Sequence, residues 1–198
     1  MPSLTNRPMR LLSVEFDELC ARHLCRHSQV GVNVVHLIAL FALWYAIYGL
    51  LFWLTGIEWV LAIPALAYVA VVAPNLPVRV FAVTVSFLGL IVATALLLPA
   101  PWWGYLVIIP ASYKLQAWSH KIYTIERDMT EFNKKYTKGS VLFVVLLIYE
   151  VPIVLNVLFF LRAQIEPGEV PVTENPQPAL HSAILAGDHH ETAGAKAS

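Results

Sequence analysis

Charged side chains are scarce in this sequence. Asp, Glu, Lys and Arg make up 13% of the residues, whereas 58% are hydrophobic and the formal net charge is zero. A soluble domain carries charge on about a quarter of its residues, so this chain has too little charge to cover the surface of a soluble protein. The lack of net positive charge and of any nucleic-acid-binding motif also argues against nucleic acid as a partner.

Cysteines and processing signals are scarce as well. Cys20 and Cys25 are the two cysteines, and two cysteines five residues apart imply no disulfide framework. We therefore expect both thiols to be free. The N-terminal residues contain no continuous apolar region and no small-residue cleavage site, so they do not resemble a signal peptide.

Long apolar runs, in contrast, are abundant, and most approach the ~20 residues needed to cross a bilayer core. We predict an all-α, polytopic membrane protein with a single helical membrane domain over residues 1–164. One run contains Lys114 and Gln116, so it is a full span, a re-entrant helix or an interfacial helix. The five predicted transmembrane helices are residues 34–54, 58–74, 78–99, 103–119 and 141–161.

Two further segments flank the predicted spans. Within residues 8–30, apolar residues such as Leu12, Phe16 and Leu19 recur at helical spacing, with charged residues elsewhere on the helical wheel. This pattern predicts an N-terminal amphipathic helix on the membrane surface. The tail, residues 165–198, is rich in Pro, Gly, Ala and polar residues, and we predict that it is disordered.

Basic residues gather on one side of the predicted bundle. With five spans, the N-terminal segment, the turn 75–79 and the loop 120–139 share a side, and they hold most of the Lys and Arg residues. The positive-inside rule makes that side, and hence the N-terminus, cytoplasmic. The Ala-, Val- and Leu-rich spans favour a bacterial inner membrane over the endoplasmic reticulum.

The histidines of the predicted membrane domain also gather at one depth. His23, His27 and His36 lie at the cytoplasmic mouth of the first span, and His120 lies at the cytoplasmic end of the fourth. His23 and His27 share a helical face, which is how a helix offers two imidazoles to one ion. A histidine-rich site with open positions favours redox-active iron, so we predict these four histidines as metal ligands. Hydrogen bonding to lipid headgroups is the alternative.

Two elements of the sequence resemble a known family. They are HSQVGVNVVH, residues 27–36, and QAWSH, residues 116–120, which is followed by Glu126. The pattern is similar to that of the small multispanning membrane proteins related to the yeast 2-hydroxy fatty acid dioxygenase of alpha-oxidation. The resemblance implies an Fe(II)-dependent oxygenase that shortens a membrane-borne 2-hydroxy fatty acid by one carbon. It also makes Glu126 and Asn33 candidate catalytic residues.

Other polar residues complete the predicted site. Cations at the headgroup level suit the anionic head of a lipid substrate, although positive-inside topology explains the same residues. Glu150 lies within the fifth predicted span, where an ionisable group is costly. It is a metal ligand, a proton relay, a partner of Lys114, or a protonated acid bonded to a neighbouring helix. The predicted substrate-binding residues are Lys114, Gln116, Lys121 and Arg127.

Two other functions stay open at this point. A non-catalytic membrane subunit or scaffold would dock a protein partner through the loop 120–139 and the helix 8–30, and would hold no metal. A haem-binding membrane protein would use two histidines on separate spans as axial ligands.

Overall fold

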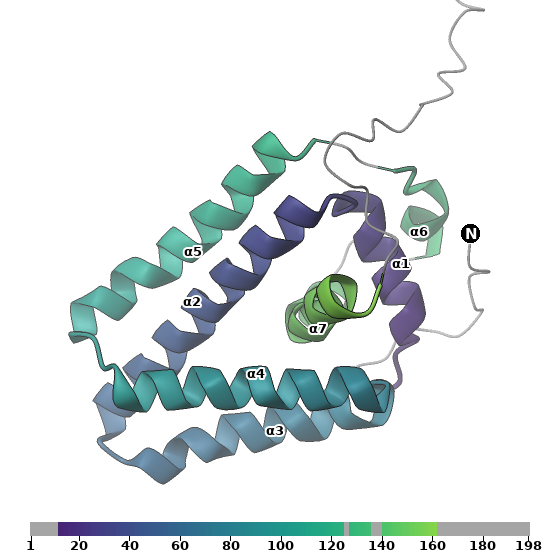
Figure 1. Cartoon of the computed structure of the whole chain (residues 1–198). Coiled ribbons are helices and arrows are strands. Elements are labelled where there is room, and N and C mark those ends of the chain that lie inside the picture. The colour runs from purple at the N-terminus through teal and green to yellow at the C-terminus, as the bar shows by residue number, and fades with distance from the viewer. Residues whose placement is uncertain (1–11, 125–126, 136–139, 162–198) are drawn as a thin grey trace, which may run out of the picture. The chain divides into compact units, whose positions relative to one another are not determined.

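The computed structural model describes residues 12–124, 127–135 and 140–161, which belong to one compact unit (Figure 1). Helices make up all the regular elements of these residues, which confirms the predicted all-α class. The predicted disordered tail lies outside the described residues. The elements are α1 (Phe16–Arg26), α2 (Val30–Thr55), η1 (Glu58–Leu61), α3 (Ala62–Val72), η2 (Ala73–Asn75), α4 (Val78–Leu97), α5 (Trp102–Ile122), α6 (Thr130–Lys135) and α7 (Ser140–Phe159).

Four of the helical segments are long and apolar enough to cross a membrane, which is the signature of a helical membrane protein. They coincide with four of the five predicted spans. The fifth candidate, α5, has 21 residues, but its second half carries Lys114 and Gln116. The four segments are Val30–Thr55, Glu58–Asn75, Val78–Leu97 and Val141–Phe159.

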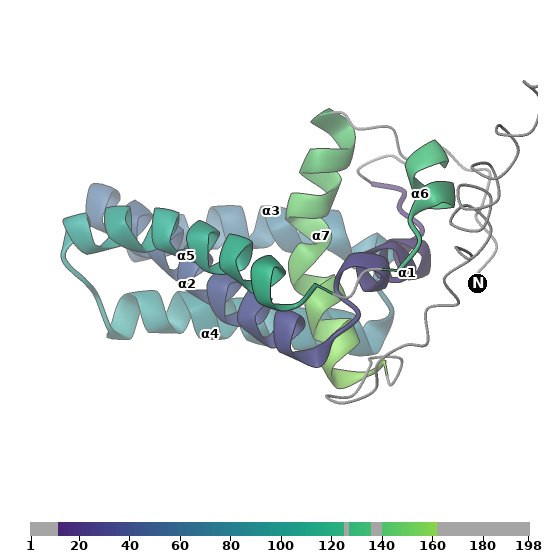
Figure 2. The ribbon, with the colours of Figure 1, turned by 90° about the horizontal axis from the view of Figure 1, so that it is seen from above.

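Helix α5 packs closely along α2, whereas α3 and α4 form a looser second pair (Figure 1). The pairs meet near the end of α2, where Tyr48, Leu61 and Ile91 form a buried apolar cluster. They diverge toward the beginning of α2, and α7 fills the space between them. Figure 2 shows that α7 runs across the four helices rather than alongside them.

Protein surrounds α7 on several sides. Tyr149 and Ile153 pack against α1, while Val154 and Leu155 pack near Leu40 of α2. The apolar window of this helix is 56% buried, against at most 28% for the other three candidate spans. A helix that is apolar all round needs an apolar neighbour on every side, and here much of that neighbour is protein rather than lipid.

Helix α1 covers α7 and forms the core of the segment predicted as a surface helix. Its apolar residues Phe16, Leu19 and Leu24 pack against α7 and against residues 72–80. The amphipathic pattern of α1 is therefore satisfied by protein contacts on its apolar side. This packing places the end of α1, and His23 with it, next to the first turns of α2.

Two glycines let α5 approach α2 closely. A Cβ atom on Gly49 would overlap the ring of Tyr105, and one on Gly31 would overlap the ring of Tyr123. Small residues at such contacts allow the backbones of packed membrane helices to come together. The contacts fix α5 along the length of α2, so the end of α5 lies beside the beginning of α2.

A buried ion pair joins α1 to α6. Lys135 Nζ lies 2.7 and 2.8 Å from the two carboxylate oxygens of Glu18, and the side chains are 18% and 5% exposed. The Lys135→Met variant removes the ammonium group that pairs with the buried Glu18 carboxylate, so we expect its free energy of unfolding to fall by about 3 kcal/mol. The thermal midpoint in mild detergent measures this. The Glu18→Met Lys135→Met double variant should recover most of the loss, and a double variant no more stable than the single would contradict this account.

Candidate metal centre

Three histidines from three separate segments converge at the beginning of α2. His27 lies between α1 and α2, His36 is on α2 and His120 is near the end of α5. One ring nitrogen of each lies within 4.8 Å of the others. Three nitrogens that bind one ion in tetrahedral geometry are about 3.4 Å apart, given metal–nitrogen bonds of about 2.1 Å. The rings must therefore close by up to about 1.4 Å to bind one ion together.

The three imidazole rings contact one another edge to face. Their centroids are 4.6 Å apart for His27 and His36, 4.8 Å for His27 and His120, and 5.1 Å for His36 and His120. Axial ligands of a haem lie on opposite faces of a porphyrin. No two of these rings leave room for a macrocycle between them, so the arrangement favours a single ion over haem.

Glu150 orients the ring of His36. His36 Nδ1 lies 3.1 Å from Glu150 Oε1, and the side chains are 4% and 24% exposed. A carboxylate partner fixes the proton on Nδ1 and leaves Nε2 with its lone pair free. His36 Nε2 is buried and meets no hydrogen-bond partner among the described residues. This pairing joins α7 to the site and is the usual support of a metal-binding histidine.

His27 is held in the same tautomer by the backbone. Its Nδ1 lies 3.2 Å from the carbonyl oxygen of His23, to which it donates. Its Nε2 is also buried, without a hydrogen-bond partner in the described part of the chain. Burial, together with the neighbouring histidines, holds the pKa of His27 far below its usual range. His27 therefore stays neutral, which is the form that binds a metal.

His23 and Asn33 support this arrangement from behind. The His23 ring stacks on the His27 ring with centroids 4.0 Å apart, and its Nε2 lies 2.9 Å from Asn33 Oδ1. Asn33 Nδ2 donates to the carbonyl oxygens of His27 and Gln29 at 2.8 and 2.9 Å, so its Oδ1 faces His23 as an acceptor. His23 Nε2 must then carry a proton, so this nitrogen is not available to bind a metal.

The neutral state of His23 makes the stability of the metal-free protein sensitive to acid. Burial is the largest cause that lowers the pKa of His23 from 6.5 to about 4. The unfolded chain takes up this proton first, so stability is full above pH 6.5 and is lost as the pH falls toward 4. We expect a loss of about 3 kcal/mol, measured as the thermal midpoint against pH with chelator present. A His23→Gln variant should show a smaller decrease, and equal decreases would contradict the assignment.

The predicted substrate-binding residues lie in the second half of α5 or just after it. Lys114, Lys121 and Arg127 are exposed, and Gln116 is partly buried. The backbone N–H of Arg127 donates to the carbonyl oxygen of Cys25 at 2.7 Å, which ties the segment after α5 to α1. The role of these four residues in binding a substrate stays a prediction. Glu126 lies outside the described residues.

Both cysteines are free, as the sequence predicted, and both are buried. Burial raises the pKa of the Cys20 thiol to about 12, and Asn156 Nδ2 donates to its sulfur at 3.3 Å. Burial also raises the pKa of Cys25. Because a thiolate is the metal-binding form, these residues belong to the packing of α1 rather than to the metal centre.

The pairing of Glu150 with His36 is the feature of the site that the sequence did not reveal. A carboxylate in an apolar helix signalled a functional position, but its partner is 114 residues away in the chain. The contact of Tyr123 with Gly31 was likewise unforeseen, because it depends on how closely α5 approaches α2. No family model matches the chain, and neither does any curated protein or solved structure.

Proposed function

We propose that this protein is a membrane-embedded, Fe(II)-dependent oxygenase that acts on a 2-hydroxy fatty acid or a similar lipid. Its metal would be held by His27, His36 and His120. One observation carries the metal centre: three imidazoles converge from distant segments, and two of them keep a buried, unpartnered Nε2. The identity of the metal and the lipid chemistry come from the resemblance of residues 27–36 and 116–120 to the dioxygenase family.

The residues present fit a catalytic ion better than a structural one. Leaving two ring nitrogens buried without partners costs about 1–3 kcal/mol each, and one metal ion bonded to both would remove that cost. Three protein ligands leave positions open for substrate, whereas structural sites are closed by four. Bound iron would supply the activation of dioxygen, while the chain orients the imidazoles of His36 and His27 through Glu150 and the carbonyl of His23.

The helix packing supports a topology in which α2 to α5 cross the bilayer. Helix α2 has 26 residues and α5 has 21, lengths of about 39 and 32 Å, and both exceed the ~30 Å of a bilayer core. Helix α7, predicted as a fifth span, would instead lie across the cytoplasmic end of this bundle. The exposed Trp53, Trp59 and Trp102 at the far end suit the opposite interface.

This topology keeps the metal centre at the cytoplasmic side. The segments before α2 and after α5 then share a side, and they carry most of the Lys and Arg residues, as the positive-inside rule requires. The centre lies at the inner interface, where the head of a lipid meets its chain. Lys114, Lys121 and Arg127 would attract an anionic head to this surface.

Metal analysis of the full-length protein tests this function. Protein purified in mild detergent without chelator, and reconstituted anaerobically with Fe(II), should contain close to one iron per chain. The His36→Ala His120→Ala variant should contain none. The parent, with dioxygen, should convert a 2-hydroxy fatty acid to the acid one carbon shorter, measured by mass spectrometry of the products.

Two results would overturn the proposal at different levels. A folded parent that takes up no metal removes the metal centre, and the non-catalytic subunit, with a protein partner at the loop 120–139, then becomes the better interpretation. A parent that binds iron but leaves 2-hydroxy fatty acids unchanged keeps the centre and removes the substrate.

A further inference from the structure

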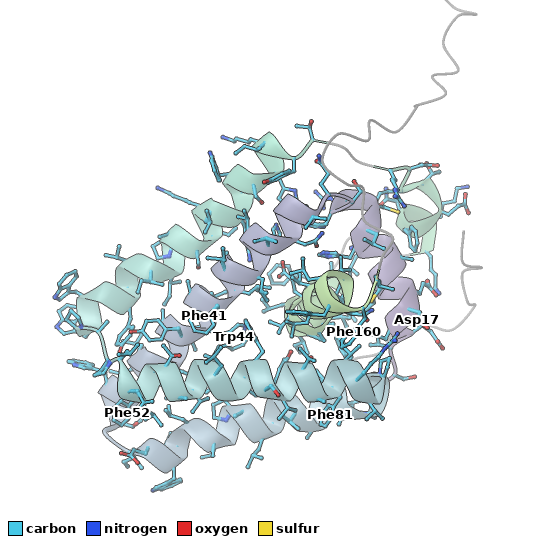
Figure 3. The ribbon with its side chains drawn as sticks, viewed as in Figure 1. Asp17, Phe41, Trp44, Phe52, Phe81 and Phe160 are labelled. Atoms are coloured by element: carbon cyan, nitrogen blue, oxygen red, sulfur yellow. The ribbon has the colours of Figure 1, made fainter. Side chains whose placement is uncertain are left out.

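An apolar cavity of about 100 Å³ lies between α2, α3, α4 and α7. Figure 3 shows Phe41 and Trp44 on the side of α2 that faces α4, and the Phe41 ring meets Phe87 of α4 with centroids 5.9 Å apart. This volume is about two thirds of the roughly 150 Å³ of a cavity that binds benzene, so it suits a stretch of a few methylene groups. The lining includes Trp44, Tyr48, Tyr68, Thr84, Phe87 and Val151.

Thr84 is the unusual member of this lining. Its side chain is 1% exposed, and its Oγ1 meets no hydrogen-bond partner among the described residues. Two other hydroxyls on α4 behave differently: Ser86 donates to the carbonyl of Ala82 at 2.9 Å, and Thr94 donates to the carbonyl of Leu90 at 2.7 Å. That bond to the preceding turn is the ordinary choice for a helical hydroxyl. Thr84 keeps its hydroxyl unused at the wall of an apolar cavity.

Two helices, α2 and α7, carry residues both at the cavity and at the metal centre. On α7, Val151 lines the cavity, and its neighbour Glu150 bonds the His36 ring. On α2, Trp44 lies eight residues beyond His36, a separation of about 12 Å along the helix axis. This separation is within the reach of a long acyl chain whose head lies at the metal centre.

We propose that this cavity binds the middle of a long-chain carboxylic acid, and that the Thr84 hydroxyl recognises an oxygen substituent on that part of the chain. The apolar walls hold the methylene groups, and the single unused hydroxyl can pair with one hydroxyl or carbonyl group. The preferred ligand then carries an oxygen in mid-chain in addition to its polar head. The placement of the head at the histidines rests on the proposed function, but the chain site does not.

Binding of a matched series of acids tests this site. The probes are octadecanoic acid and the monohydroxyoctadecanoic acids whose hydroxyl is moved stepwise along the chain. Their affinities are measured by competition with a radiolabelled fatty acid on the full-length protein in detergent. We expect one isomer, or two adjacent ones, to bind about tenfold more tightly than octadecanoic acid, as one buried hydrogen bond allows.

Three substitutions on α4 assign the preference to Thr84. Thr84→Val removes the hydroxyl at nearly constant shape, and should bind the best isomer and octadecanoic acid equally. It should also raise the thermal midpoint of the unliganded protein, because a buried unpaired hydroxyl is lost. Thr84→Ser should keep the preference. Thr94→Val is the matched control, since Thr94 already bonds Leu90, and it too should keep the preference.

The test of the chain site can fail without affecting the metal centre, and the reverse also holds. The His36→Ala His120→Ala variant should still bind hydroxyoctadecanoic acids more tightly than octadecanoic acid, because the bond to Thr84 needs no metal, although the preference for one position can broaden when the head is not fixed. A parent that binds no isomer better than octadecanoic acid would overturn the chain site and leave the iron chemistry intact. A preference that persists in Thr84→Val would also overturn it.

Discussion

Replacing His120 by alanine is expected to lower the affinity for Fe(II) by more than about 100-fold, because loss of a supporting partner alone costs 10–100-fold. His27→Ala and His36→Ala should match it, since one ring nitrogen of each residue converges on the same point. The measurement is competition with a chelator of known affinity, on protein whose fold is checked by circular dichroism. A His120→Ala variant that retains parent affinity would show that the ion, if bound, lies elsewhere.

His23 supplies the informative comparison. The sequence predicted it as a fourth ligand, whereas the structure places its Nε2 at 2.9 Å from Asn33 Oδ1. If His23 only positions His27, His23→Ala should lower the affinity by about tenfold, at the lower end of the range for supporting residues. If His23 is a ligand, the loss should equal that of His120→Ala. The size of this one effect decides between three and four histidines.

The positions of the helices along the chain were predictable, because each long apolar run in the sequence indicates one helix. Val30–Thr55 and Val78–Leu97 fall close to the predicted spans 34–54 and 78–99. The position of α7 was not predictable from hydropathy. Lipid and the protein interior are both apolar surroundings. An apolar helix therefore has the same hydropathy pattern whether it spans the bilayer or packs across other helices.

The candidate site was predictable as a group of residues but not as a geometry. The basic residues and the spans placed His27, His36 and His120 on one side, and the structure brings these three together. Which histidine offers a nitrogen to the metal and which only positions a neighbour depends on individual side-chain contacts, and a sequence pattern does not reveal these. Asn33 bonds two carbonyls and His23, which makes it a scaffold for the turn before α2. Its predicted catalytic role stays untested.

The Glu150→Leu variant is expected to show the second large effect, a loss of Fe(II) affinity of about 10–100-fold with all three histidines intact. His36 Nδ1 would lose the carboxylate oxygen that lies 3.1 Å away. The ring could then rotate, or carry its proton on Nε2, and either change removes the lone pair that faces the ion. Glu150→Gln keeps an acceptor oxygen at the same place, so its loss should be smaller. Chelator competition measures both variants against the parent.

Asn156 provides the matched control, because it is another buried polar residue of α7 and its amide bonds the sulfur of Cys20. Asn156→Leu should change the thermal midpoint while the folded protein keeps its affinity for Fe(II). If Glu150→Leu also lowers only the midpoint, Glu150 stabilises the crossing of α7 with α2 and does not orient a ligand. If Glu150→Leu loses affinity and Asn156→Leu does not, a helix that runs across the bundle controls a metal centre built on α2 and α5. That result would explain why an ionisable residue occurs in an otherwise apolar helix.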